Sequence, residues 1–461
     1  MLQRGINHLA LFTTMFVVLC GGPFGMEEIV PLSGPGLFAL VLLVVPLVWA
    51  VPYALIVAEL VSELPMEGGA YQWFRAGLGP FWSFIFTYLE WISWALDAAL
   101  YPALFAEYLI SAFVMLGLIE APSPWMHVPI CLAVIWGCGW LNIRGVKEVG
   151  FFSTMMTLII LVPVIAMVLL AIPQMSMAQF SPLMPEDQSG WDALKYGLVW
   201  AIWSYSGYDA LAAAGEEIVE PERTYPKVLA IFLPISIAAY VLPLWAGLAV
   251  LPDWQAWEVG HLGEAGFVLG GALLGTLLLT AFTVATLGIY NGEQLVLARF
   301  LYAMARDGML PPALARLHER FQTPHVSLIF HAVLFSALSL MFDFVELLVL
   351  GAIVSVPVYI ITFVSPLILR WRYPNLRGPF RIPGGWPVII PTALVPTAIA
   401  GFLIASATQE ELVAAVGFVA VAPFVYWAAR AYNRWRGIEA VASSPVEVLE
   451  ALERGKARPD D

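Results

Sequence analysis

Apolar residues dominate the chain in long runs that are separated by short polar segments. A helix that crosses the hydrocarbon core of a bilayer needs about 20 mostly apolar residues. Twelve runs are candidates for such helices, at residues 9–30, 36–61, 81–117, 127–142, 149–172, 191–214, 226–250, 264–298, 325–342, 345–370, 386–406 and 411–431. The pattern predicts an all-α integral membrane protein with twelve transmembrane helices, a permease domain over 1–436 and a short polar tail over 437–461.

The charges of the polar segments test this number of spans. Lysine and arginine gather in alternate loops and near both termini, so that all 21 of them except Lys195 fall on one face. By the positive-inside rule that face is cytoplasmic. We therefore expect a multi-pass protein of the cell membrane with an even number of spans and both termini in the cytoplasm.

Composition supports the same class. The chain is 61% hydrophobic and 12% charged, whereas soluble domains are about 45–50% apolar and about 25% charged. The formal net charge is −13, and the loops expected outside the cell are acidic. That outer face should attract cations, and no nucleic-acid partner is expected.

Reactive residue types form no catalytic or metal-binding constellation. The three cysteines lie in predicted spans, and the six histidines are scattered along the chain. Buried single thiols are typical of small core residues. We expect no enzymatic activity, no metal and no cofactor. The outer loops also lack a cysteine that would tie on an obligate partner subunit.

The stretch GGPFGMEE, residues 21–28, interrupts the first apolar run. In hydrocarbon every backbone N–H and C=O needs a partner, so such a break persists only where the freed groups face protein, water or a ligand. A half-helix that starts after it presents free amides and a partial positive charge. The interpretation is a substrate site that includes Gly21, Gly22, Pro23, Phe24, Gly25 and Glu27. The alternative is a kink with no ligand.

A second interruption lies five spans later. The sixth run contains the candidate binding residues Ser204, Tyr205, Ser206, Gly207 and Asp209. Interrupted helices at corresponding places in two halves indicate a transporter whose site lies between inverted repeats. This spacing predicts a five-plus-five inverted repeat, with a first repeat over 9–172, a second over 191–370 and two added helices over 386–431.

Carboxylates at membrane depth are costly and are candidates for function. The third run places Glu90, Trp94, Asp97 and Tyr101 on one helical stripe, because they are three or four residues apart. Acids between aromatic rings suit an organic cation through charge pairing and cation–π attraction. The alternative is that the acids pair with basic or hydroxyl groups to hold the fold.

Other positions carry weaker signals. Glu293 is a further membrane-depth acid, and Glu59 is interpreted as a solvated helix end. The third and eighth spans are long, so we expect them to be tilted or to extend past the bilayer. Small residues four or five apart predict close helix packing in the eighth run, at Gly266, Gly270, Gly271 and Gly275.

Several motifs resemble the amino acid–polyamine–organocation superfamily. The run from Gly21 to Trp82, with GGPFGMEEIV and WAVPYALIVAELVSELPMEGGAYQWFRAGLGPFW, is most similar to plant-type polyamine:proton symporters, as is WISWALDAALYP at 91–102. YSGYDALAAAGEEIVEPERTYPKV at 205–228 and RFLYAMARDGMLPPALARLHERFQTP at 299–324 match general superfamily patterns. The resemblance covers nearly the whole chain.

The resemblance implies a LeuT-like fold with spans one, three, six and eight around the substrate. It implies a secondary transporter that imports polyamines or cationic amino acids by proton symport. Glu27, Asp97 and Glu293 are the candidates for proton coupling, while threonines in the eighth span leave sodium open. The alternative is a neutral amino acid permease or exchanger, because Tyr53 replaces the glutamate of the plant pattern and the Tyr205–Asp209 stretch is closer to amino acid carriers.

Overall fold

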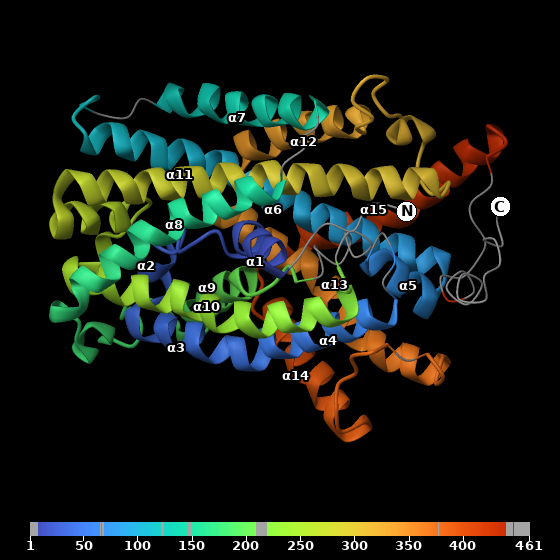
Figure 1. The fold of residues 1–461 in the computed structure, drawn as a ribbon, viewed down its shortest axis with the longest axis horizontal. Coiled ribbons are helices and arrows are strands. Elements are labelled where there is room, and N and C mark those ends of the chain that lie inside the picture. The colour runs from blue at the N-terminus through green and yellow to red at the C-terminus, as the bar shows by residue number, and fades with distance from the viewer. Residues whose placement is uncertain are drawn as a thin grey trace.

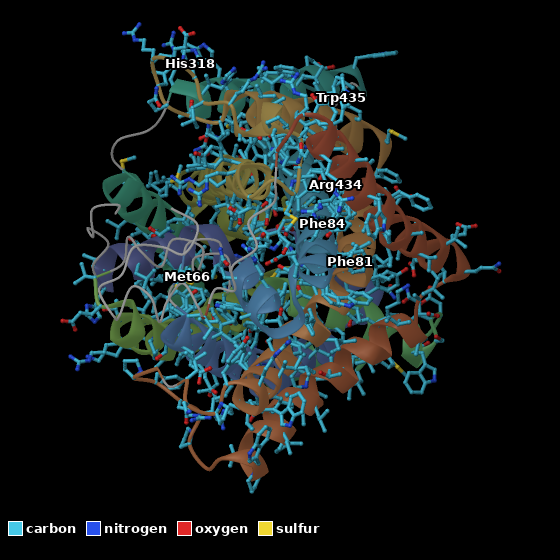
Figure 2. The ribbon with its side chains drawn as sticks, turned by 90° about the vertical axis from the view of Figure 1, so that its right-hand side faces the viewer. Met66, Phe81, Phe84, His318, Arg434 and Trp435 are labelled. Atoms are coloured by element: carbon cyan, nitrogen blue, oxygen red, sulfur yellow. The ribbon has the colours of Figure 1, made fainter. Side chains whose placement is uncertain are left out.

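The computed structural model describes residues 8–64, 66, 69–120, 124–144, 149–208, 219–376, 378–438 and 446. Within these ranges the regular structure is helical. Most of the long helices run along the longest axis of the molecule, with α7 and α12 on one side and α3 and α14 on the other (Figure 1). Figure 2 shows the bundle turned by 90°, with side chains filling the space between the helices.

The helices of the first half begin and end close to the predicted limits. They are α1 (His8–Met15), a π-helical turn (Phe16–Cys20), α2 (Ile29–Ser33), α3 (Pro35–Val45), a second π-helical turn (Pro46–Ala50), α4 (Val51–Glu63), α5 (Ala70–Leu78), α6 (Pro80–Met115), α7 (Pro124–Arg144) and α8 (Val149–Ala171). α3, the second π-helical turn and α4 together form one continuous span, Pro35–Glu63. α5 precedes α6 as a short additional helix.

The helices of the second half follow in chain order. They are α9 (Gly190–Ser204), α10 (Pro221–Val250), α11 (His261–Arg306), α12 (His325–Met341), α13 (Phe344–Arg372), α14 (Trp386–Ala405) and α15 (Gln409–Trp435). Short 3₁₀ turns lie at Ile172–Gln174, Met177–Phe180, Trp254–Ala256 and Pro312–Ala315.

Nine helices of the described residues are long and apolar enough to cross a membrane. The other three predicted spans are shorter for visible reasons. The first is divided at residues 21–28, the described part of the sixth ends its helix at Ser204, and α12 has 17 residues. The chain is therefore a multi-pass helical membrane protein.

α6 lies at the centre of the bundle. It packs against α11, α13, α12, α7 and α5 along its length. Its first turns also contact α15 through aromatic rings: Phe81 and Phe84, both labelled in Figure 2, lie 5.0 and 5.2 Å from Tyr426 between ring centroids. The acidic stripe predicted on α6 is thus surrounded by other helices.

The prediction of one long eighth span is wrong. α11 is divided at Gly270 and Gly271, whose backbone angles are not helical, with φ of 65° at Gly271. The two arms then fold against each other: a Cβ atom on Gly266 would lie 3.1 Å from the Cα of Gly275. The predicted close packing is confirmed for Gly266, but it joins two arms of a hairpin, whereas Gly271 at the bend has open space around it.

The prediction that Glu59 is a solvated helix end is also wrong. Its side chain is fully buried at the end of α4. Both carboxylate oxygens accept hydrogen bonds of 2.7 Å from Arg370 at the end of α13. The backbone N–H of Ile382 donates a third bond, also of 2.7 Å. The carboxylate is stable there because its charge and its acceptors are all paired.

Lys195, the one basic residue outside the expected cytoplasmic face, is 3% exposed near the start of α9. Its ammonium group lies 2.7 Å from a carboxylate oxygen of Glu411 at the start of α15. A paired lysine at this position joins two helix ends. Its exception to the charge pattern therefore has a structural reason.

Candidate functional site

The first span is broken where the sequence predicts. α1 ends in the π-helical turn Phe16–Cys20, and helix resumes only at Ile29. Gly21, Gly22 and Gly25 have φ values of 56°, 100° and 71°, a region that residues with a Cβ atom rarely adopt. Glycine at these positions is what allows the chain to leave the helix and cross the bundle.

The second break begins at the end of α9. The helix stops at Ser204, and the next four residues, 205–208, are not helical. Gly207 has φ of 85°, and a Cβ atom there would lie 2.9 Å from Leu19 and 3.6 Å from the Trp94 ring. Asp209, the last predicted site residue of this stretch, lies outside the described residues.

One hydroxyl group connects the two breaks. Tyr240, on α10, lies 3.2 Å from the carbonyl oxygen of Cys20 and 3.2 Å from that of Ser204. These carbonyls end the helical part of each span. Because a hydroxyl has a single proton to donate, it bonds one of the two carbonyls at a time. Trp49 adds a bond of 2.9 Å to the Ser206 hydroxyl.

A cavity opens where the two breaks meet α6, α10, α11 and α13. The predicted site residues that line it are Gly22, Phe24, Trp94, Asp97, Tyr101, Ser204, Ser206, Gly207 and Glu293. Glu90, from the predicted stripe, lines it too. Residues that the sequence places more than 200 positions apart are therefore brought to one space, as the two interruptions suggested.

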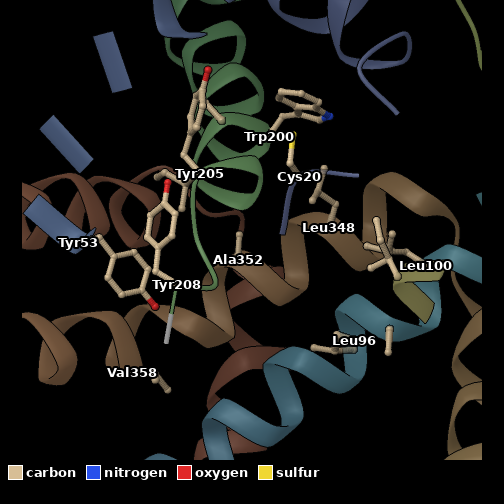
Figure 3. Close-up of a cluster of buried hydrophobic side chains, with 14 of the residues drawn as sticks. Cys20, Tyr53, Leu96, Leu100, Trp200, Tyr205, Tyr208, Leu348, Ala352 and Val358 are labelled. Atoms are coloured by element: carbon tan, nitrogen blue, oxygen red, sulfur yellow. The ribbon is translucent and has the colours of Figure 1, made fainter. Parts of the chain in front are cut away.

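Five predicted site residues do not line this cavity, namely Gly21, Pro23, Gly25, Glu27 and Tyr205. Glu27 is buried instead beside Tyr108 on α6, whose hydroxyl donates to it at 3.0 Å and accepts from the Gly25 amide at 2.8 Å. Tyr205 turns away and donates to the carbonyl of Leu42 at 3.1 Å. Figure 3 shows Tyr205 and Tyr208 along the end of α9, with Tyr53 beside Tyr208.

Asp97 accepts hydrogen bonds from two aromatic side chains of the cavity. Trp203 Nε1 donates to one oxygen at 2.5 Å, and the Tyr101 hydroxyl lies 3.4 Å from the other. Glu293, on α11, lines the same cavity as Asp97.

Aromatic rings and acids give the cavity its character. Phe24, Tyr101 and Trp203 lie within 6.3 Å of one another between ring centroids. The described residues that line the cavity include three acids, Glu90, Asp97 and Glu293, and no lysine, arginine or histidine. Negative charge and π faces together are suited to an organic cation.

Sequence reasoning missed several wall residues. Trp203 lies directly before the second break. This position was a sequence signal that could have identified Trp203 as a wall residue. Tyr240 and the α13 residues Ser355 and Tyr359 also line the cavity. Those residues belong to apolar runs whose polar members show no spacing that distinguishes a wall from a packing contact.

A broken membrane helix that meets a second helix end around an acidic, aromatic cavity defines the class of helical membrane transporters. Comparison with known proteins then gives the family. The amino acid permease family matches residues 9–430. The chain belongs to this family and is a secondary transporter, as the motif resemblance predicted.

Similar proteins include transporters from plants and bacteria. The chain is 29% identical to a polyamine transporter of Oryza sativa subsp. japonica over 99% of this chain and 84% of that protein. It is 30% identical to a probable polyamine transporter of Arabidopsis thaliana over 90% of this chain and 82% of that protein. A serine/threonine exchanger of Bacillus subtilis is 26% identical over 83% of this chain and 87% of that protein.

Proposed function

We propose that this transporter imports polyamines or cationic amino acids by proton symport. The observation that carries the proposal is the charge of the cavity: three acids and no basic group among its described lining residues. Negative charge in a low-dielectric space is expensive, so a bound cation lowers the free energy of the site. The names of the similar plant proteins support a polyamine as that cation.

The Asp97–Glu293 pair supports a role for protons. Both carboxyl groups line one cavity, and two carboxylates that share a site favour one proton between them because like charges repel. In the proposed cycle the charge binds an ammonium group of the substrate while the proton travels with it. Glu27 is the third candidate for proton coupling, and its bond to Tyr108 places it beside the first break, outside the cavity lining.

The remaining parts of the proposal concern architecture. We infer twelve spans with a five-plus-five inverted repeat over 9–172 and 191–370, two added helices over 386–431 and a cytoplasmic tail over 437–461. The two interruptions five spans apart support this arrangement. The charge pattern of the loops supports a cell-membrane location with both termini in the cytoplasm.

A neutral amino acid permease or exchanger is the second candidate. The carbonyls beside Tyr240 and the glycine-rich first break offer partners for an amino and a carboxylate group. A substrate carboxylate, however, would lie in a cavity with three acids, where like charges repel. The acidic lining therefore favours a substrate with a net positive charge over a neutral amino acid.

Uptake into proteoliposomes tests the transport proposal. Radiolabelled spermidine is offered to vesicles with an imposed inward proton gradient, an inward sodium gradient or neither. We expect the proton gradient to accelerate uptake and the sodium gradient alone to leave it unchanged. Uptake that follows sodium and ignores the pH difference would refute proton symport, and uptake of leucine alone would support the second candidate.

A further inference from the structure

Tyr108, on α6, lies between an acid and the backbone of the first break. Its hydroxyl donates to Glu27 Oε2 at 3.0 Å and accepts from the Gly25 amide at 2.8 Å. All three residues are buried. The Tyr108 ring packs against Phe282 on α11, with 5.4 Å between ring centroids, so the hydroxyl is held in place from outside the break. One side chain therefore connects the Glu27 carboxyl group to the backbone of the break.

The amide that Tyr108 holds belongs to the peptide bond between Phe24 and Gly25. Phe24 lines the cavity, and its ring lies edge-on to Trp203 at 5.9 Å between ring centroids. Gly25 also lies against the start of α13, because a Cβ atom there would lie 2.9 Å from the Phe344 ring. The peptide is thus fixed between a hydroxyl and an aromatic ring. Release of the bond to Tyr108 would free Phe24 to shift in the cavity wall.

The strength of this connection depends on the charge of Glu27. Its side chain is 0% exposed, and Oε1 has no hydrogen-bond partner among the described residues. A proton that enters from outside can bind Oε1 and leave Oε2 as a neutral carbonyl acceptor. Hydrogen bonds to an ionised acceptor are about twice as strong as neutral ones. Protonation therefore weakens the bond from Tyr108 and, because the two bonds polarise each other, the bond from Gly25.

The charged groups around Glu27 are mostly acids. Four of them interact electrostatically with Glu27 or with its neighbour in the break, and they come from the break, α6, the turn before α11 and the start of α13: Glu28, Glu107, Glu258 and Asp343. His127 on α7 lies 3.8 Å from Glu107, and the Gly260 amide faces the Glu27 carboxyl group. Negative charge of this density concentrates cations, protons included, beside the break.

From these contacts we propose that Tyr108 is a positioning residue that transmits the proton on Glu27 to the Phe24 peptide and so to the cavity. While Glu27 is ionised, the two hydrogen bonds hold Phe24 against Trp203. When Glu27 is protonated, the bonds weaken and this part of the wall is released. The inference rests on the proposed proton symport, since it names the residue through which the proton acts on the cation site.

Tyr108→Phe tests the proposal, because it removes the hydroxyl and keeps the ring that packs on Phe282. Proteoliposomes take up radiolabelled spermidine with and without an inward proton gradient. We expect the gradient to accelerate wild-type uptake about tenfold or more, the effect of one charge-assisted bond. Uptake by Tyr108→Phe should stay within about twofold of its own rate without a gradient. Saturable spermidine binding by the variant shows that it is folded.

Tyr88→Phe is the matched control for loss of a tyrosine hydroxyl from the same helix. The Tyr88 ring packs against Phe84 and Trp91, and Tyr88 does not line the cavity. The control should keep the full acceleration by the proton gradient.

Glu27→Gln separates this route from other effects of the hydroxyl. Glutamine keeps an acceptor oxygen for Tyr108 and cannot ionise, so uptake by this variant should ignore the gradient. If Tyr108 acts through Glu27, the double variant Glu27→Gln/Tyr108→Phe should transport like Glu27→Gln alone. Losses that add in the double variant would overturn the proposal.

The outcomes also separate the inference from the proposed function. If Tyr108→Phe keeps the wild-type acceleration, Tyr108 has no positioning role, while proton symport stands. A Tyr108→Phe protein that does not bind spermidine would equally overturn the inference, because the hydroxyl would then serve the fold. Wild-type uptake that ignores the proton gradient would overturn the proposed coupling and the inference with it.

Discussion

Asp97 combines two roles that a single substitution can separate. Its oxygens accept bonds from Trp203 and Tyr101, and its negative charge is available to a cation. Asparagine keeps an acceptor oxygen for Trp203 and loses the charge. The residue therefore allows a test in which the fold is preserved and the electrostatics of the cavity change.

We predict that Asp97→Asn lowers spermidine uptake by roughly 10- to 100-fold, the loss expected for a charge-assisted hydrogen bond. The melting temperature in detergent should change little. Asp187→Asn, at an exposed position, is the matched control and should transport normally. Unchanged uptake in Asp97→Asn would remove this carboxylate from the binding site.

Tyr240 is the second residue at which removal of a single atom, the hydroxyl oxygen, tests the site. Its hydroxyl lies between the carbonyls that end both broken helices. We predict that Tyr240→Phe lowers spermidine affinity about fivefold or more, because loss of the bond is worth about 1 kcal/mol and leaves a buried carbonyl without its donor. Scintillation proximity binding measures the effect.

The control for Tyr240→Phe is Tyr426→Phe, whose ring packs on α6 far from the breaks. It should bind spermidine like the wild type. Identical affinities for wild type and Tyr240→Phe would show that the hydroxyl does not shape the site.

At the scale of the helices, the end of α4 is fixed to the end of α13. The buried pair of Glu59 and Arg370 is bidentate, and the Ile382 amide completes it. Removal of one partner leaves an uncompensated buried charge, which costs about 3–5 kcal/mol. Removal of both leaves no charge at all, so the pair should show strong coupling.

We predict that Arg370→Met lowers the apparent melting temperature sharply and that the double variant Glu59→Gln/Arg370→Met recovers part of the loss. Thermal unfolding in detergent measures both. The exposed Arg306 is the matched control, and Arg306→Met should stay within about 0.5 kcal/mol of the wild type. A double variant less stable than Arg370→Met would contradict the interpretation.

The helices also show what the sequence could predict. The limits of most spans and the first break were predictable, because apolar runs and GGPFG are strong local signals. The hairpin in α11 was not, since small residues four or five apart predict close packing without saying whether it lies between two helices or two arms of one. Glu59 was misjudged because its partner is 311 residues away.

The cavity residues also divide into those that the sequence could predict and those that it could not. The stripe on α6 was predictable from spacing along one helix. The contribution of α13 was not, because Ser355 and Tyr359 lie in an apolar run with no polar contrast, and only tertiary packing brings them to the site. Glu27 and Tyr205 were predicted from their place in the breaks, but local sequence cannot say toward which side a side chain points.

For the whole molecule, the account makes one central claim: the space between the two breaks holds an organic cation because its described wall is acidic and aromatic. A net charge of −13 concentrates cations around the protein in a general way. Binding at the cavity differs from that background, because it is saturable and depends on Asp97.

The most direct test is equilibrium binding of radiolabelled spermidine to the purified wild-type protein, with unlabelled putrescine, arginine and leucine as competitors. The account predicts saturable binding that polyamines displace, that leucine does not displace and that Asp97→Asn loses. Binding of leucine with no measurable binding of spermidine would contradict it.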